Sequence, residues 1–241
     1  SKLKDYRYSA TFDYLKLDDL SPFISSLTFL PDTVKEKMAN ISIHGELNQG
    51  KLIYDPENAP DHRFHFDTQF SHVDTELGPQ LPAFSNLSGQ LYGYFNQGVI
   101  MLDSDQSLLK SDLLENKFLQ FSHLKGKVNW HKKQSEWKLA TENLLVENEK
   151  LTVNLSGNII KFSDERSPFI DIVVSLDEME LEHISKLMPY SPRFKLRDWM
   201  RRSVLGGKLS SASVLFRGHI SDFPFDSHNG RFKLIADATD A

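Results

Sequence analysis

One short pattern occurs five times and constrains the fold of this 241-residue chain more than any other feature. In each copy, two apolar residues flank a glycine at every second position and polar side chains occupy the two positions between them, as in Leu87-Ser88-Gly89-Gln90-Leu91. Because side chains alternate between the faces of a β-strand, these three positions share one face. Glycine inside a strand typically marks a bend, a bulge or a close approach by another group. The pattern therefore predicts strands that bend midway along an apolar face, unless some copies coincide by chance near turns. The other four copies are centred on Gly45, Gly126, Gly157 and Gly218.

Apolar and polar residues also alternate in further segments, for example from Phe64 to Phe70 and from Ile170 to Leu176. Such alternation is typical of strands with one buried and one solvated face. We therefore predict a mainly β fold, an elongated and curled antiparallel sheet of groove-like form with roughly a dozen strands. A few short helices are expected at 21–27, 32–38, 181–187 and 195–205, the last with Trp199 on its apolar side.

A longer unit recurs along the chain. It consists of an alternating strand, an acidic apolar stretch, a connector with proline and then a glycine-centred strand. Repeats of this kind favour an array that grows along one axis, in which each unit packs mainly on its neighbours. We expect one continuous segment over 1–241, with repeat units at 6–60, 61–165 and 166–241.

Composition excludes several classes of function. The formal net charge of −5 gives no electrostatic reason to bind nucleic acid. The absence of cysteine excludes disulfides and thiolate metal sites. No segment reaches the ~18 consecutive apolar residues of a membrane-spanning helix.

Residues capable of catalysis or metal binding are present but poorly arranged. The densest potential metal ligands are His62, His65, Asp67 and His72. On one strand, His62 and His65 point to opposite faces, which argues against a metal site. Acid pairs suited to glycoside hydrolysis are Asp103 with Asp105 and Glu180 with Glu182. Nothing pairs these acids with a substrate platform, so we expect no enzyme activity, no cofactor and no metal.

Several stretches, taken in order and with their spacing, resemble the YhdP family of AsmA-like envelope proteins. The stretches are LRDWM (196–200), GGKL (206–209), LFRG (215–218), DFPF (222–225), GRF (230–232), LP (81–82), LSG (87–89) and GVIMLD (98–103). The resemblance extends from about Phe64 to the end of the chain and, more loosely, over the first sixty residues.

The resemblance implies a location and a partner. Members of the family are similar to chorein-type bridge proteins, in which a long sheet forms a trough for phospholipid between the inner and outer membranes. The chain is then expected to be an internal periplasmic piece of a protein anchored in the inner membrane by an N-terminal helix that lies outside this sequence. Implied partners are phospholipid acyl chains and neighbouring segments of the same protein, with outer-membrane or periplasmic proteins as further candidates. The family carries no catalytic motif.

Two interpretations of the apolar face remain open from the residues. In the first, the face lines an open lipid groove. In the second, it is the fully packed core of a structural or protein-interaction scaffold. The helices expected from the sequence are too few to cover a dozen strands, and this favours the groove. The predicted groove-lining residues are Phe66, Phe70, Leu87, Leu91, Leu124, Val128, Trp130, Trp137, Leu155, Ile159, Ile172, Val174, Phe216 and Ile220.

Overall fold

The computed structural model describes residues 7–19, 42–76, 83–111, 117–149, 151–164, 166–180, 207–223 and 225–239. These residues form a 12-stranded sheet and short 3₁₀ turns. The strands are β1 (Tyr8–Lys16), β2 (Ser42–Tyr54), β3 (Phe64–Glu76), β4 (Ala83–Tyr94), β5 (Gln97–Lys110), β6 (Phe118–Lys133), β7 (Glu136–Asn148), β8 (Leu151–Phe162), β9 (Phe169–Leu176), β10 (Met179–Glu180), β11 (Lys208–His219) and β12 (Arg231–Thr239). The turns are η1 (Leu17–Asp19), η2 (Pro60–His62) and η4 (Ile220–Asp222).

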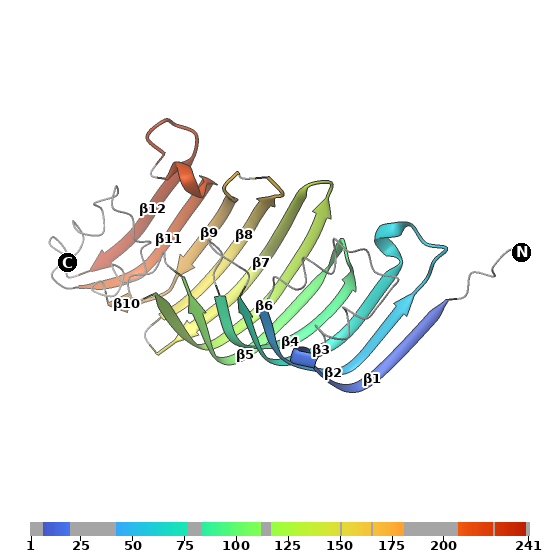
Figure 1. Cartoon of the computed structure of the whole chain (residues 1–241). Helices are drawn as coiled ribbons and strands as arrows, with labels where there is room; N and C mark the ends of the chain where they lie inside the picture. Colours follow the sequence, from blue (N-terminus) through green and yellow to red (C-terminus); the bar gives the residue numbers. More distant parts are fainter. Residues whose placement is uncertain are drawn as a thin grey trace, which may run out of the picture.

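The strands lie side by side in chain order, and every pairing is antiparallel. β11 pairs with β9 on one side and with β12 on the other, and β10 pairs with β11 beyond the residues that contact β9. Figure 1 shows an open sheet whose strands bend midway, with β1 at one end and β12 at the other. The predicted mainly β, antiparallel fold is confirmed, although the sheet is only weakly curled. The four predicted helices, including the one that carries Trp199, lie outside the described residues.

The strand registers give the sheet one apolar and one polar face. Leu91 of β4 lies opposite Ile100 of β5, which in turn lies opposite Val128 of β6. Farther along the sheet, Leu155 of β8 lies opposite Val174 of β9. Side chains directly opposite each other project from the same face, so these rows share what we call the apolar face. The alternate residues project from the polar face.

The glycines of the repeated pattern all lie within strands, with φ angles between 128° and 159°. At Gly157, a Cβ atom would lie 2.1 Å from the carbonyl oxygen of Asp171 on β9. At Gly126, it would lie 2.6 Å from the carbonyl oxygen of Asn143 on β7. Only glycine combines a positive φ with so close an approach of the neighbouring backbone. At Gly45, Gly89, Gly126 and Gly157, the pattern thus marks points where adjacent strands come unusually close, whereas at Gly218 the Phe225 ring makes the close approach.

A second set of irregularities crosses the sheet without glycine. His72, Asn86 and Gln106, on adjacent strands, have φ angles of 52°, 60° and 54°. The β3–β4 and β4–β5 registers shift beside these residues, as expected for β-bulges. The Asn86 side-chain amide donates to the Asp105 carbonyl at 2.9 Å, and the Ser107 hydroxyl donates to the Asn86 carbonyl at 3.0 Å. These bonds satisfy backbone groups that the bulges remove from the ladder and let the apolar face continue past them.

Candidate functional site

The registers place thirteen of the fourteen predicted lining residues on the apolar face. These residues are Phe66, Phe70, Leu87, Leu91, Leu124, Val128, Trp130, Trp137, Leu155, Ile159, Ile172, Val174 and Phe216. Ile220 differs, because it lies beyond the end of β11 in the turn η4. Its backbone N–H donates to the carbonyl of Pro168 at 3.1 Å, so the chain leaves the sheet there.

Burial varies along the apolar face. Leu124 and Trp130 are only 3% and 8% exposed, whereas Trp137 is 39% exposed. Most of the other predicted lining residues, among them Leu91 and Leu155, are half-buried. A small buried cluster lies on β8 and β11, formed by Leu151, Val153, Leu209 and Ala212. The face therefore combines packed stretches with apolar surface that remains partly accessible.

Trp130 forms an anchor on the apolar face near the C-terminal end of β6. Its ring stacks on Phe66 with a centroid separation of 5.9 Å and an interplanar angle of 4°. To reach β3 from β6, the ring extends over Gly98 and Gly93, where an added Cβ atom would lie 2.1 Å and 3.2 Å from it, respectively. These two glycines thus give the indole its place flat against the sheet.

Aromatic rings gather where strands β1–β3 and β11–β12 reach one edge of the sheet. Tyr54 contacts both Tyr8 and Phe64, with ring centroids 6.4 Å and 4.7 Å apart. At the other end of the sheet, Phe225 packs 5.2 Å from Phe216. The Phe225 ring occupies the space above Gly218 and is 8% exposed. Phe225, which lies in the DFPF stretch, is not among the predicted lining residues, because it follows the end of β11 and alternation within the strand does not reach it.

The acidic pair Asp103 and Asp105 lies on the polar face and forms a charge network. Lys125 Nζ is 3.0 Å from Asp103 Oδ2, and His123 Nδ1 is 2.7 Å from Asp105 Oδ1. The hydrogen bond from Lys125, reinforced by the charges of Lys125 and His123, lowers the pKa of Asp103 below its ordinary value. A general acid needs a raised pKa, so Asp103 is unsuited to that role. Of the other pair, Glu180 is exposed on β10 and Glu182 lies outside the described residues.

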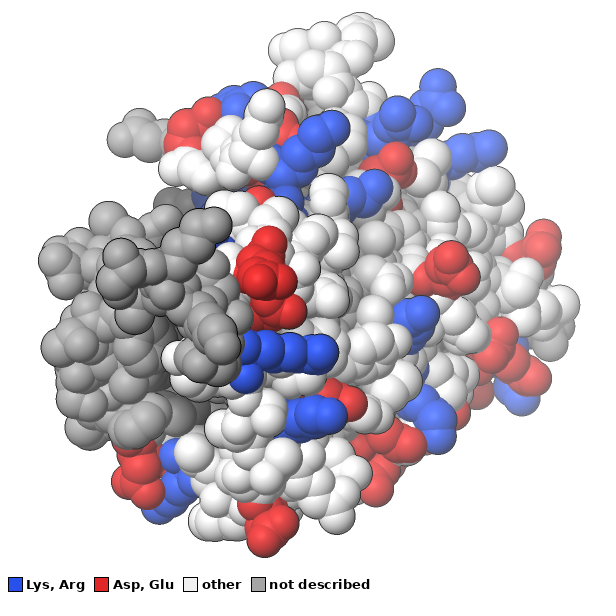
Figure 2. Space-filling view, turned by 90° about the vertical axis from the view of Figure 1, so that its right-hand side faces the viewer, with Lys and Arg blue, Asp and Glu red and all other residues white. Residues whose placement is uncertain are grey.

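Charges of both signs are interspersed over the face that Figure 2 shows, which is seen from the β1 end of the molecule. There is no extended single-sign surface in this view. The distribution agrees with the small net charge of the chain.

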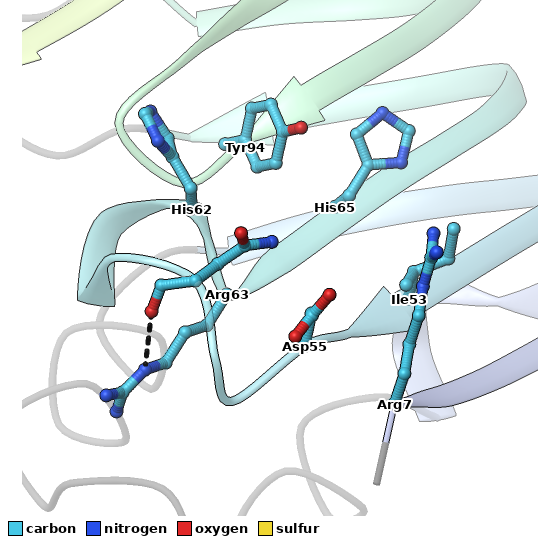
Figure 3. A pocket seen from close by; sticks show the side chains of 8 residues that line it. Arg7, Ile53, Asp55, His62, Arg63, His65 and Tyr94 are labelled. Atoms are coloured by element: carbon cyan, nitrogen blue, oxygen red, sulfur yellow. Dashed lines mark hydrogen bonds between the residues drawn. The ribbon is translucent and has the colours of Figure 1, made fainter. Parts of the chain in front are cut away.

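A shallow recess lies beside the β2–β3 connection and is lined mainly by polar residues (Figure 3). The Tyr94 ring packs between His62 and His65, with centroids 4.8 Å and 5.1 Å away. Arg63 turns aside and donates from Nε to the Asn58 carbonyl at 3.3 Å. Among the described residues, no three or more His, Cys, Asp or Glu side chains come together as metal ligands would. His65 and Tyr94 project from the polar face, opposite to Phe66.

Comparison with known proteins identifies a family but no individual relative. No curated protein and no solved structure matches the chain. Within the described residues, no helix is long and apolar enough to cross a membrane. The sequence does match the family described as YhdP protein over residues 2–241, which is nearly its whole length. The chain therefore belongs to the YhdP family of AsmA-like, envelope-associated proteins.

Proposed function

We propose that this chain is a segment of a periplasmic lipid conduit. On this proposal, its apolar face holds phospholipid acyl chains and passes them along the sheet between the inner and outer membranes. The observation that carries the proposal is the apolar face itself, which the strand registers continue from β1 to β12 on one side of the sheet. Family membership supports the same conclusion.

The dimensions of the face suit an acyl chain. The strands lie side by side, and a spacing of about 4.8 Å between neighbours gives a path of roughly 50 Å. Each methylene removed from water contributes ~0.8 kcal/mol, so even a partly covered chain is held firmly. Because half-buried apolar residues recur on successive strands, neighbouring positions offer similar binding energy, and movement along the face needs no large barrier.

The two ends of the sheet support a role as one piece of a longer path. β1 and β12 each have a partner on one side only among the described strands. An edge strand presents unpaired backbone N–H and C=O groups, which readily pair with another strand. We propose that preceding and following segments of the same protein pair there and extend the apolar face in both directions.

A scaffold with a packed core is the second candidate. The buried cluster of Leu151, Val153, Leu209 and Ala212 favours it, because such close packing leaves no room for an acyl chain at that point. The half-buried state of Leu91 and Leu155 favours the conduit along the rest of the face.

Three charge substitutions distinguish the two candidates. Leu155→Asp places a carboxylate on the half-buried apolar face, where water still solvates it partly. Asn154→Asp adds the same charge to the polar face of the same strand and is the matched control. Leu124→Asp places the charge at a position only 3% exposed and should unfold the chain on either account.

The conduit predicts that Leu155→Asp folds but loses lipid crosslinking and, in the full-length protein, loses envelope function. Asn154→Asp should retain both. A packed scaffold predicts instead that Leu155→Asp fails to fold, as Leu124→Asp does. A folded Leu155→Asp variant that still crosslinks lipid and supports the envelope would contradict the assignment of this face.

A further inference from the structure

One row of residues departs from the apolar face at its edge. Lys132 of β6 lies opposite Trp137 of β7, and Trp137 lies opposite Lys161 of β8. The adjacent row toward the centre of the sheet is Trp130, Leu139 and Ile159, which is entirely apolar. Among the described strand residues that are regularly paired, leaving out those at the bulges, Lys132 and Lys161 are the charged residues that the registers place on the apolar face.

The geometry of this row suits a boundary between acyl chains and water. Lys132 Nζ lies 5.5 Å from the centroid of the Trp137 ring, a cation–π distance. Trp137 and Leu139 are 39% and 42% exposed, so the apolar surface next to the two ammonium groups is accessible. Neither lysine forms an ion pair with a described residue. Long lysine side chains lay their methylenes along apolar surface and hold the charge at its edge, where tryptophan is also favoured.

We propose that Lys132, Trp137 and Lys161 form a docking site for the phosphate of a phospholipid whose acyl chains lie on the apolar face. This inference rests on the proposed function. It adds that the lipid headgroups travel along the edge of the sheet that carries these three residues. The two ammonium groups flank the phosphate, and the Trp137 ring packs against the glycerol and the first methylenes.

The same hairpin supplies a matched control. Lys133 and Lys138 are also exposed and lie within a few residues of Trp137, but they alternate onto the polar face. Lys132→Gln/Lys161→Gln and Lys133→Gln/Lys138→Gln remove equal charge from the two faces. Each variant would be purified and titrated with phosphatidylethanolamine and with a diacylglycerol of identical acyl chains.

The wild-type chain should bind the phospholipid more tightly than the diacylglycerol. Lys132→Gln/Lys161→Gln should weaken phospholipid binding roughly two- to thirtyfold, the range expected from two exposed ion pairs, and leave diacylglycerol binding unchanged. Lys133→Gln/Lys138→Gln should leave the affinities for both lipids near those of the wild type. Salt should weaken only the binding of the phospholipid.

Photoreactive lipids locate the two ends of the molecule. A diazirine on the headgroup should label 132–137 and Lys161, and a diazirine at the end of an acyl chain should label the centre of the apolar face. Equal loss of phospholipid binding in both double variants, or headgroup labelling on the polar face, would overturn the docking site. If the wild type binds the two lipids with equal affinity and the acyl probe still labels the apolar face, the docking site is overturned and the proposed function stands. Failure of the acyl probe to label the apolar face would overturn the proposed function as well.

Discussion

Substitution of Gly157 by alanine tests the structural reason for the repeated glycine. The residue has a φ angle of 132°, which costs a side-chain-bearing residue about 1–3 kcal/mol. The added methyl group would also lie 2.1 Å from the carbonyl oxygen of Asp171 and 2.8 Å from the Cα of Ile172. Relief of these contacts requires β8 and β9 to separate locally. Loss of one or two ladder hydrogen bonds adds about 1 kcal/mol each. We therefore expect Gly157→Ala to lower the free energy of unfolding by about 2–5 kcal/mol.

Urea unfolding followed by far-UV circular dichroism measures this change as a shift of the transition midpoint. Ser156→Ala is the control, because Ser156 precedes Gly157 on the same strand but projects from the polar face. Its effect should stay within about 0.5 kcal/mol, as for most surface substitutions. A Gly157→Ala variant as stable as the control would refute the close approach of the two backbones at this position.

Two further predictions concern specific contacts. The losses of unfolding free energy caused by Phe12→Ala and Gly50→Ala should be strongly non-additive, with a coupling of about 0.5–3 kcal/mol. The reason is that the three atoms nearest to a Cβ on Gly50 all belong to the Phe12 ring, the first at 1.9 Å. A double-mutant cycle in urea measures the coupling, and additive losses would show that the ring does not cover Gly50. The pKa of Asp103 should lie below its ordinary value of 3.8 and rise in Lys125→Ala, as carbon-detected NMR titration would show. A carboxyl whose pKa is lowered by folding stabilises the folded state at pH values above its ordinary pKa. The contribution of Asp103 should therefore be lost as the pH falls below about 4. An Asp103 pKa at its ordinary value in the wild type would contradict the network.

The strands and their faces could be predicted because one face of the sheet is apolar. In such a sheet, a one-residue slip would expose every apolar side chain, so the alternation at Leu87, Leu91, Leu155 and Ile159 fixes both the strand and its orientation. The glycine pattern predicted bends, and the structure adds their cause in the close approach of the next strand. The prediction failed at Ile220. Its spacing from Phe216 suggests the same face, but β11 ends at His219 and the chain has already turned away from the sheet at Ile220.

Other features depend on pairings that alternation cannot predict. Of the bulge residues His72, Asn86 and Gln106, only histidine and asparagine are types that favour positive φ, and all three types occur in ordinary strands and loops. The row of Lys132, Trp137 and Lys161 joins three strands and exists only because of their registers. Parity within one strand could not bring these residues together.

The most direct measurement of the central claim is a comparison of adjacent residues on one strand. A photoreactive amino acid replaces Leu155 or Asn154 in the full-length protein, the cells are irradiated, and phospholipid attached to the protein is detected. If the apolar face is the lipid path, position 155 on that face crosslinks phospholipid and position 154 on the polar face does not. Equal crosslinking at the two positions, or none at position 155 in a folded protein, would contradict the assignment of the apolar face as the lipid path.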